Sequence, residues 1–333
     1  MPSPRQDEGL RPEIGPVVGA RPLWSVMIPA YNCGRFLGET LESVLRQDPG
    51  PDEMQIEVVD DHSTADDPEA VARAVGGERV SVFRQPVNVG NARNFNTCLR
   101  RSRGHLVHIL HGDDAVRESF YGTLGTALAT HANVGAAFCR YISIDEKSNW
   151  QTISPLERPT PGPIDGWLEK IALGQRLQPP CMVVRREVYE HVGGFDENLS
   201  YGEDWAMWTR IAAKYPVWYE PAPLALYRVH GGSVTASMRG GRWIDHSRRV
   251  IELNATLLPE PRRPAFVADS RRILAATILR RAERILGAGD RPAVTTYVLE
   301  ALRTSRDLGV LTQAVYLAAR WVRHVAGTAR RQT

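Results

Sequence analysis

The sequence contains little cysteine and no long hydrophobic run. Its four cysteines, Cys33, Cys98, Cys139 and Cys181, are far apart and lack the spacing of a metal-binding motif. Four scattered thiols in 333 residues are typical of reduced core side chains in a cytoplasmic protein. No apolar run approaches the ~20 residues that a membrane-spanning helix needs. Residues 1–20 also lack the apolar stretch of a signal peptide.

The composition is otherwise that of a globular protein. Hydrophobic residues make up 43% of the chain and include eight tryptophans, which is enough apolar material for a large core. The length allows one large α/β domain with an extension. Residues 1–21 are rich in proline and glycine, and we interpret them as a disordered lead-in.

Charge is unevenly distributed along the chain. From Arg239 to Thr333 there are 18 arginines, no lysine and 8 acidic residues, a balance of +10, whereas the rest holds 23 basic and 30 acidic residues, a balance of −7. We therefore place a domain boundary between residues 238 and 239. The C-terminal region, 239–333, is predicted to be basic and α-helical. It contains about four amphipathic helices, one of which starts at Asp290.

Short apolar runs alternate with amphipathic segments in the first third of the chain. The expected strands lie at residues 24–30, 55–59, 80–84 and 105–110, and the expected helices at 34–47, 67–75 and 91–101. This alternation predicts an α/β fold with a mainly parallel sheet and helices on both faces. Polar residues follow the strands directly, at the edge where open α/β sheets bind ligands.

The second third of the domain has weaker patterns. A strand is expected at residues 181–184 and helices at 186–192 and 204–215. The segment from 150 to 180 is rich in proline and glycine, and its pattern does not indicate a particular helix or strand.

Two adjacent carboxylates, Asp113 and Asp114, follow the apolar strand at 105–110. Neighbouring carboxylates repel each other, so a fold that holds them together needs a compensating charge. Mg²⁺ or Mn²⁺ supplies one, because these ions prefer oxygen ligands and bridge to phosphates. The alternative is a polar turn in which Asp114 is the N-cap of a helix.

Asp60 and Asp61 end an earlier strand in the same way and are followed by His62, Ser63 and Thr64. Carboxylates here suit the donor groups of a nucleobase or a ribose. The alternative is an Asx turn that leads into the next helix.

A third acidic group, Glu203 and Asp204, lies among Tyr201, Trp205 and Trp208. A carboxylate among aromatic side chains acquires a raised pKa, which suits the deprotonation of a hydroxyl group. Aromatic faces also stack on sugar rings. The alternative is that Asp204 caps the following helix.

The motif from Tyr227 to Ser233, YRVHGGS, offers two further candidates. Arg228 suits a phosphate and His230 suits a metal ion, and the two glycines allow the loop to approach a ligand closely. The alternative for His230 is a structural role.

These groups are most informative in their order along the chain. The blocks SVMIPAYNCGRFLGETLESVLRQ, IEVVDDHSTADD, NVGNARNFN and HILHGDD resemble the donor half of family 2 glycosyltransferases with the GT-A fold. The later blocks VVRREVYEHVGGFDENLSYGEDWAMWTRIA and LALYRVHGGSVT resemble that family's acceptor half and closing loop. The resemblance covers residues 23–235. It implies a Rossmann-like nucleotide-binding core at 22–238, with a donor half at about 22–116 and an acceptor half at about 117–238.

The resemblance also implies roles for individual donor-side residues. The nucleotide pocket would be lined by Pro29, Ala30, Tyr31 and Asn32, together with Asp60, Asp61, Arg93, Gly112 and Asp113. The family's Asp-x-Asp metal motif falls on residues 111–113, where His111 stands in the place commonly taken by the first Asp. The metal ligands would therefore be Asp113, Asp114 and His230.

On the acceptor side, Asp204 matches the family's catalytic base. Glu203, Trp205 and Gly194 would contact the acceptor. The implied reaction is inverting transfer of a sugar from a nucleoside diphosphate sugar, expected to be a UDP-sugar, to an acceptor hydroxyl. Mn²⁺ or Mg²⁺ would neutralise the leaving group.

The resemblance and the charge pattern together suggest partners and a location. The acceptor would be a glycan, a lipid-linked molecule or a small molecule in polysaccharide or glycoconjugate biosynthesis, and nucleic acid is not an expected partner. The enzyme is expected in the cytoplasm. Its basic C-terminal helices, such as residues 312–325 with Val315 and Tyr316 on one face, would either contact the inner membrane surface or pack within the protein or a homo-oligomer.

Two other functions stay open at this point. A sugar nucleotidyltransferase would need a glycine-rich, basic first loop, and residues 29–32 contain neither Lys nor Arg. A catalytically inactive nucleotide-sugar-binding protein is favoured by His111 and opposed by the retained Asp113, Asp114, Glu203 and Asp204.

Overall fold

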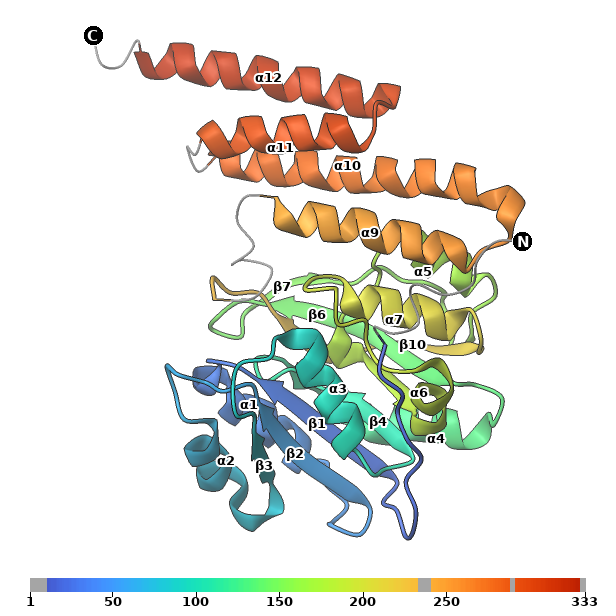
Figure 1. Ribbon diagram of the computed structural model, residues 1–333. Helices are drawn as coiled ribbons and strands as arrows, with labels where there is room; N and C mark the ends of the chain where they lie inside the picture. The colour runs from blue at the N-terminus through green and yellow to red at the C-terminus, as the bar shows by residue number, and fades with distance from the viewer. Residues whose placement is uncertain (1–10, 233–240, 288–290, 330–333) are drawn as a thin grey trace. The chain divides into compact units, whose positions relative to one another are not determined.

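The computed structural model describes residues 11–232, 241–287 and 291–329. The chain divides into two compact units (Figure 1). The first contains Met1–Ile171 and Gln175–His230, and the second contains Ala172–Gly174 and Gly231–Thr333. The boundary predicted between residues 238 and 239 lies outside the described residues.

A ten-stranded sheet forms the centre of the first unit, in the order β3-β2-β1-β4-β9-β6-β10-β5, with β7 beside β6 and β8 beside β10. Its strands are β1 (Trp24–Ala30), β2 (Met54–Asp60), β3 (Ser81–Arg84), β4 (Leu106–Ile109), β5 (Ala115–Val116), β6 (Ala136–Ile144), β7 (Trp150–Ile153), β8 (Gly162–Pro163), β9 (Met182–Arg185) and β10 (Val217–Arg228). Strands β1 to β4 pair in parallel, as predicted. Strand β9 runs antiparallel to both β4 and β6, so the sheet as a whole is mixed.

The helices of this unit are α1 (Gly34–Leu45), α2 (Pro68–Gly76), α3 (Asn91–Arg101), α4 (Phe120–Thr130), α6 (Arg186–Val192) and α7 (Glu203–Ala212), together with α5 (Trp167–Leu173) up to Ile171. Local sequence explains their limits. In α2, Pro68 occupies the first turn and the Asp67 carboxylate accepts the Ala70 N–H at 3.1 Å. In α1 the apolar spacing places Phe36 and Leu41 in the core, as the pattern predicted.

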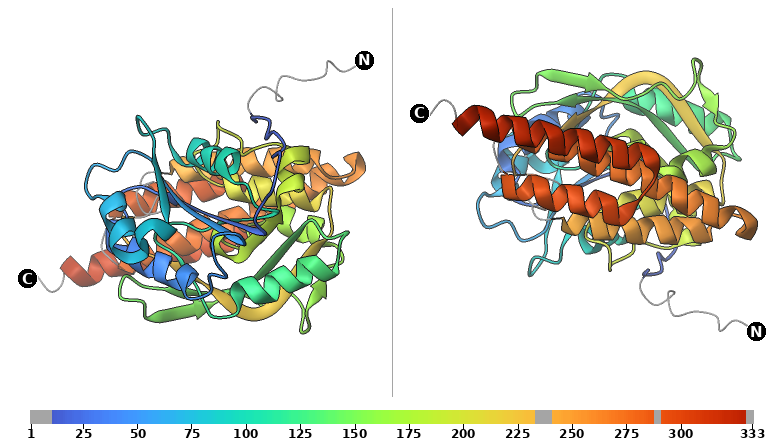
Figure 2. Two further views of the ribbon diagram at one scale, coloured as in Figure 1. Left: turned by 90° about the horizontal axis from the view of Figure 1, so that it is seen from below. Right: turned by 90° about the horizontal axis from the view of Figure 1, so that it is seen from above.

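Right-handed crossovers place α1 and α2 on one face of the sheet and α3 on the other (Figures 1 and 2). Strand β1 is covered on both faces, and all seven of its residues are buried. Its neighbours are β2 on one side and β4 on the other, so β1 lies where the strand order reverses. The carboxyl end of such a strand is the expected ligand-binding edge of an open α/β sheet.

The prediction of a disordered lead-in is wrong for residues 11–21. Ile14 is buried, and the Pro12 carbonyl accepts the Gly194 N–H at 2.8 Å. Arg186, itself buried, donates to the Gly15 carbonyl at 2.9 Å. The prolines and glycines of residues 11–21 prevent a regular helix or strand, but they do not prevent the segment from packing in one conformation. Residues 1–10 lie outside the described part of the chain.

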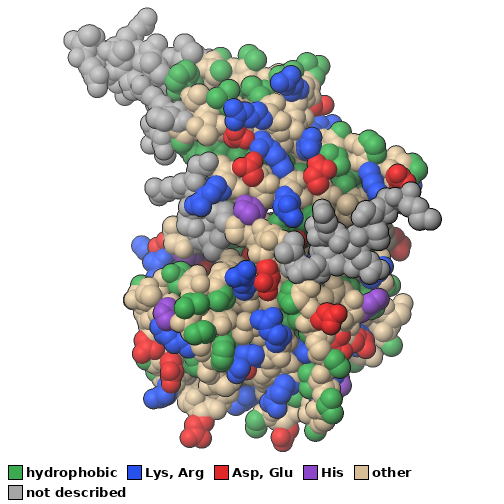
Figure 3. Space-filling model, in the orientation of Figure 1, with side chains coloured by type: hydrophobic (Ala, Val, Ile, Leu, Met, Phe, Trp, Pro, Cys, Tyr) green, Lys and Arg blue, Asp and Glu red, His purple; other side chains and the backbone are tan. Residues whose placement is uncertain are grey.

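The second unit contains helices α9 (Arg242–Thr256), α10 (Arg263–Gly287), α11 (Arg291–Thr304) and α12 (Leu308–Ala329), in agreement with the predicted helical region. Helix α10 packs against α9, α11 and α12 (Figure 2). Basic and acidic side chains are interspersed on the face of the second unit that Figure 3 shows. Among the described residues, we find no helix with the length and apolar character that crossing a membrane requires.

Gly104 illustrates how closely the central strands approach each other. It precedes β4, and a Cβ added there would lie 2.4 Å from the Ser25 nitrogen and 2.4 Å from the Trp24 carbonyl carbon of β1. These are backbone atoms that cannot move aside without disturbing the β1–β4 pairing.

We predict that Gly104→Ala lowers the free energy of unfolding by about 1–3 kcal/mol or more, the cost of overpacking a core. Urea unfolding followed by circular dichroism measures the loss. The matched control is Gly122→Ala in α4, where an added Cβ has no atom within 4 Å. Alanine is the better helix former, so this control should be neutral or stabilising. Equal stability of the two variants would contradict the steric explanation.

Candidate active site

The loops after β1, β2, β4 and β10 carry most of the residues that the sequence singled out. Strands β2 and β4 flank β1 and run parallel to it, so their carboxyl ends meet at one edge of the sheet. His230 follows the end of β10 and reaches the loop after β4, because its Nε2 lies 2.9 Å from Asp113 Oδ2. The tertiary structure therefore joins residues more than a hundred positions apart.

Asn32 organises the loop after β1. It has a left-handed backbone, with φ of 49°, and its Oδ1 accepts the N–H groups of Thr64 and Ala65 at 2.8 and 2.9 Å. Its own N–H donates to Ser63 Oγ at 2.9 Å. Tyr31 beside it is half exposed. Asn32 thus joins the loops after β1 and β2 and leaves the Tyr31 ring available to a ligand.

Asp60 and Asp61 are both buried, but they do different things. Asp60 Oδ1 accepts the N–H and the hydroxyl of Ser63, and its Oδ2 pairs with Arg84 at 3.0 Å. Asp60 therefore forms the polar turn considered as an alternative above. Asp61 accepts the N–H groups of Val89 and Gly90 at 2.8 and 2.9 Å. Burial raises the pKa of Asp61 above its ordinary value.

The loop after β4 is pressed against the loop after β1. The Gly112 N–H donates to the Pro29 carbonyl at 3.0 Å, and a Cβ at Gly112 would lie 2.8 Å from Cys33 Sγ. Only glycine allows this approach without displacement of its neighbours. The next residue, Asp113, is thereby held at the edge of the predicted nucleotide pocket formed around Pro29 and Ala30.

Asp113 and His230 form a hydrogen-bonded pair. Arg35 Nη2 lies 3.3 Å from His230 Nδ1, and a guanidinium only donates, so Nδ1 is the acceptor. The Nε2 proton is donated to Asp113 Oδ2, because a carboxylate oxygen only accepts. Burial raises the pKa of Asp113, but the hydrogen bond from His230 and the charge interactions with His111 and His230 outweigh it, and the net pKa is lowered.

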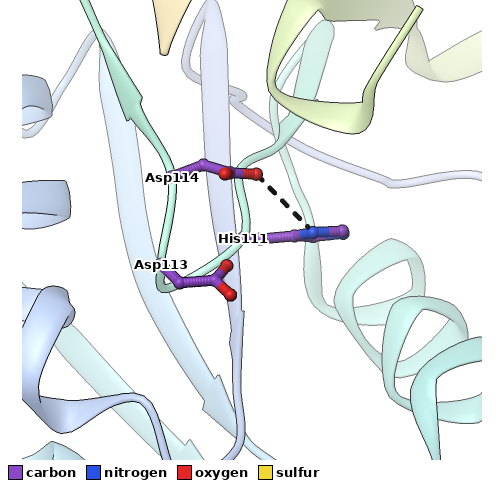
Figure 4. A group of neighbouring side chains, drawn as sticks. All are labelled: His111, Asp113 and Asp114. Carbon is purple, nitrogen blue, oxygen red and sulfur yellow. Dashed lines mark ion pairs between the residues drawn. The ribbon is translucent and has the colours of Figure 1, made fainter. Parts of the chain in front are cut away.

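Asp114 and His111 face each other across a short gap (Figure 4). Asp114 Oδ1 accepts the Arg228 N–H at 2.8 Å, whereas its Oδ2 is buried, has no hydrogen-bond partner and lies 3.7 Å from His111 Nδ1. His111 Nε2 is also buried without a partner. Burial and the neighbouring Asp113 raise the pKa of Asp114, and burial lowers that of His111. The N-cap role considered as an alternative for Asp114 is wrong, since strand β5 and not a helix follows it.

This donor set fits a divalent cation. One ligand atom each from His111, Asp113 and Asp114 lie within 4.8 Å of one another. The unpartnered Asp114 oxygen is the kind of buried polar atom that an ion would satisfy. Carboxylates with one imidazole suit Mn²⁺ and similar ions.

Arg228 and Arg93 lie differently from what their motifs suggested. The Arg228 guanidinium is buried and donates to the carbonyls of Asp113 and Asp145 and to Ser148 Oγ, so its interpretation as a phosphate ligand is wrong in this arrangement. Arg93 is mostly exposed and pairs with Glu197 at 3.1 Å. Its contact with a nucleotide stays a prediction.

Glu203 and Asp204 begin helix α7. The N-cap is Gly202, with φ of 75°, so Asp204 is not the cap that was considered as an alternative. Asp204 Oδ2 accepts Gln175 Nε2 at 2.7 Å and its Oδ1 accepts the Trp205 N–H at 2.7 Å. Burial raises the pKa of Asp204 to about 6. Burial and the Asp204 charge raise the pKa of Glu203 to about 8.

The other predicted acceptor residues are enclosed. Trp205 is buried and its indole N–H donates to the Ile171 carbonyl at 2.6 Å. Gly194 is buried, and a Cβ there would lie 2.5 Å from Asn96 Oδ1. Their contact with an acceptor stays a prediction.

Tyr227 is a site residue that sequence reasoning did not single out. Burial raises its pKa, and the charges of Asp113, Asp114 and Asp204 act on it in the same direction. The sequence signal that could have pointed to Tyr227 is its place beside Arg228 at the start of the YRVHGGS block. The sequence marked His111 only as a departure from the family's Asp-x-Asp motif, yet its side chain lies close to the carboxylates of Asp113 and Asp114.

Known proteins with similar sequences belong to one family. The profile described as "Glycosyl transferase family 2" matches residues 25–193, and that described as "Glycosyltransferase like family 2" matches residues 177–250. An uncharacterized protein of Mycobacterium tuberculosis is 28% identical over 67% of this chain and 72% of its own length. An uncharacterized glycosyltransferase of Rickettsia prowazekii is 24% identical over 64% of this chain and 66% of its own.

Solved structures share the fold. S. aureus TarS 1–349 superposes with a TM-score of 0.63 at 16% identity, covering 93% of this chain and 92% of that one. A structure of the same fragment in complex with UDP-GlcNAc gives a TM-score of 0.61 at 17% identity, with the same coverage. This chain spans only 43% of a longer TarS chain. The family profile nevertheless covers more than half of the sequence, and the chain belongs to glycosyl transferase family 2.

Proposed function

We propose that the protein transfers a sugar from a nucleoside diphosphate sugar, with UDP as the expected nucleotide, to an acceptor hydroxyl with inversion at the anomeric carbon. One observation carries the proposal. At the carboxyl end of β4, ligand atoms of His111, Asp113 and Asp114 lie within 4.8 Å of one another, and the buried Asp114 Oδ2 has no hydrogen-bond partner, as expected where a cation would hold a diphosphate. The UDP-GlcNAc complex of TarS, whose fold is similar, supports this class of donor.

The donor end would be formed by the loops after β1, β2 and β4. Tyr31 supplies an exposed aromatic ring, and Asp61 keeps lone pairs beyond its two backbone hydrogen bonds. The cation held by the His111, Asp113 and Asp114 cluster would neutralise the charge that develops on the diphosphate. Gly112 sets the distance between this cluster and the pocket wall.

The acceptor end would depend on Asp204. With a pKa of about 6, its carboxylate is ionised at neutral pH and still basic enough to take a proton. Each oxygen accepts one hydrogen bond from the protein, which leaves a lone pair for the acceptor hydroxyl. Glu203, with a pKa of about 8, is protonated at that pH and adds no second charge. A single displacement needs no covalent sugar–enzyme intermediate.

We predict that Asp204→Asn lowers the transfer rate by about 10²–10⁴-fold while UDP binding changes little, because the amide cannot accept the proton. In the wild type, kcat should fall about tenfold per pH unit below pH 6, since a base with a raised pKa is lost as pH falls through that value. Initial rates and calorimetric UDP titrations measure both effects.

The matched control is Asp67→Asn, which keeps an N-cap acceptor on α2 and should leave the rate unchanged. Near-normal transfer by Asp204→Asn would remove this residue from the mechanism. If Asp204→Asn keeps some activity and that activity has the wild-type pH profile, Asp204 is likewise not the base.

We predict that chelation by EDTA abolishes transfer and that Mn²⁺ restores it. Asp113→Asn and Asp114→Asn should each weaken cation-dependent UDP binding by at least the ~10–100-fold that loss of an outer-shell partner costs. Calorimetry with and without Mn²⁺, together with elemental analysis of the protein, tests both statements. Full activity in protein shown to be free of metal would contradict metal dependence.

The predicted partners of the C-terminal helices include a membrane surface and a second subunit. Several arginines there are paired with acidic residues of the same unit, namely Arg248, Arg271, Arg272, Arg303 and Arg320. Helix α12, by contrast, buries Val310, Ala314 and Leu317 and leaves Val315 and Tyr316 more than half exposed. Paired charge and an exposed apolar stripe support contact with a second copy of the chain over attraction to anionic lipid.

We predict a concentration-dependent dimer that the double variant Val315→Ser/Tyr316→Ser converts to a monomer. Sedimentation velocity measures it, with Thr312→Ser, an exposed change on the same helix, as the control. A monomer at every wild-type concentration would contradict this prediction. Salt-sensitive co-sedimentation with phosphatidylserine vesicles would favour the membrane instead.

A further inference from the structure

The candidate base, Asp204, is a buried carboxylate that relies on hydrogen bonds for its charge. Burial raises its pKa to about 6, and the groups that act against burial are its own N–H, the Trp205 N–H and the Gln175 amide. Among the described residues, none of the groups that shift this pKa is a cation. A buried carboxylate without a cationic partner is kept ionised by the hydrogen bonds that it accepts.

Of these donors, only Gln175 comes from a distant part of the chain. The Trp205 N–H belongs to the next residue of α7 and donates to Asp204 Oδ1 at 2.7 Å. Gln175 lies 29 positions before Asp204, in the loop after α5, and its Nε2 donates to Asp204 Oδ2 at 2.7 Å. The helix supplies the first contact by itself, whereas the second exists only because the tertiary structure brings the loop to α7. Together they fix both carboxylate oxygens.

The loop that carries Gln175 is anchored on both sides. Four residues before it, the Ile171 carbonyl accepts the Trp205 indole N–H at 2.6 Å. Directly after it, Arg176 Nε donates to Glu157 Oε1 at 2.7 Å, and the Glu157 side chain is only 5% exposed. Gln175 itself is exposed, so burial of apolar surface does not explain its position. Its contact with the candidate base is the hydrogen bond that does.

We propose that Gln175 is a positioning residue for the candidate base: its amide holds the Asp204 carboxylate in one orientation and favours the ionised form that takes the proton of the acceptor hydroxyl. A neutral amide suits this task, because a cation in the same place would stabilise the carboxylate so far that it became a weak base. Gln175 acts through Asp204 and exchanges no proton itself. The inference rests on the transfer reaction proposed above, in which Asp204 is the base.

The charged and titratable groups around Asp204 allow its ionisation to be followed separately. The charge of Asp204 raises the pKa of Glu203 on α7, which is about 8, and that of Tyr227 on β10. Both groups are therefore mainly neutral where Asp204 titrates. Arg176, beside Gln175, is paired with Glu157. A change in the Asp204 pKa after substitution of Gln175 thus reports on their hydrogen bond.

The test follows the Asp204 carboxyl carbon by NMR, between about pH 5 and 8, in full-length protein labelled with carbon-13 at its aspartate carboxyl groups. The Asp204 signal is the one that disappears in Asp204→Asn. Gln175→Met keeps a side chain of similar length without the donor, and Gln175→Lys keeps a donor and adds a positive charge. The matched control is Gln151→Met, which removes an exposed amide that donates to Asp145 Oδ2 at 3.2 Å.

We expect an Asp204 pKa of about 6 in the wild type and in Gln151→Met. It should rise by about 0.5–1 pH unit in Gln175→Met, the equivalent of one hydrogen bond, and fall below the wild-type value in Gln175→Lys. Shifts of opposite sign indicate a direct contact, because a mere disturbance of the loop would act in the same direction in both variants.

The rate should follow the pKa. The base must be ionised, so a raised pKa means that activity is lost at a higher pH as the solution is made more acidic. The acid limb of kcat for UDP release from UDP-GlcNAc, with water as the acceptor, should therefore move to higher pH in Gln175→Met and to lower pH in Gln175→Lys.

An unchanged Asp204 pKa in Gln175→Met, a shift of the same sign in both Gln175 variants, or an equal shift in Gln151→Met would overturn the inference. The proposed function would then still stand if Asp204→Asn lowers transfer as predicted. A pKa that moves as expected while the acid limb of kcat stays in place would instead remove Asp204 as the base, and the inference with it.

Discussion

The buried guanidinium of Arg228 is the constraint on which the rest of the site depends. A charge that is removed from water must have its donors satisfied, and Arg228 does so with carbonyl groups on the loops after β4 and β6 and with the carboxylate of Glu39 on α1. Its backbone N–H holds Asp114. Helix α1, the end of β10 and both loops are thereby fixed relative to one another. The candidate cation ligands Asp113 and Asp114, which lie on the loop after β4, are held in place with them.

Burial then gives neighbouring carboxylates different properties. Asp113 receives a hydrogen bond from His230 and has a lowered pKa, whereas Asp114 beside it has a raised pKa because burial and the charge of Asp113 disfavour its ionised form. The pKa values of Asp204 and Glu203 also differ. Hydrogen bonds from Trp205 and Gln175 hold the pKa of Asp204 to about 6, whereas burial and the Asp204 charge raise the pKa of Glu203 to about 8. Environment rather than residue type therefore sets how readily each of these carboxylates ionises.

The fold of the donor half was predictable because its elements are local. Apolar runs and amphipathic spacing gave β1, α1 and α3 with limits that differ from the structure by two residues or fewer. Strand β10 was not predicted, because Pro221 and Pro223 lie at a register irregularity that obscures its pattern. The order of residues 11–21 was also missed, since it comes from Ile14 and from backbone hydrogen bonds to distant residues.

The family, the α/β class and the identity of the candidate residues were determined by the sequence alone, because the motifs are short blocks in a fixed order. The candidate base, Asp204, was named in the same way, and its role stays a prediction. Only the tertiary structure decided how these residues divide their tasks. It turned Asp60 and Arg228 inward as structural groups, paired His230 with Asp113 and brought His111 to the open oxygen of Asp114. The physical reason is that hydrogen-bond partners and burial are set by contacts between loops far apart in the chain, which no local pattern records.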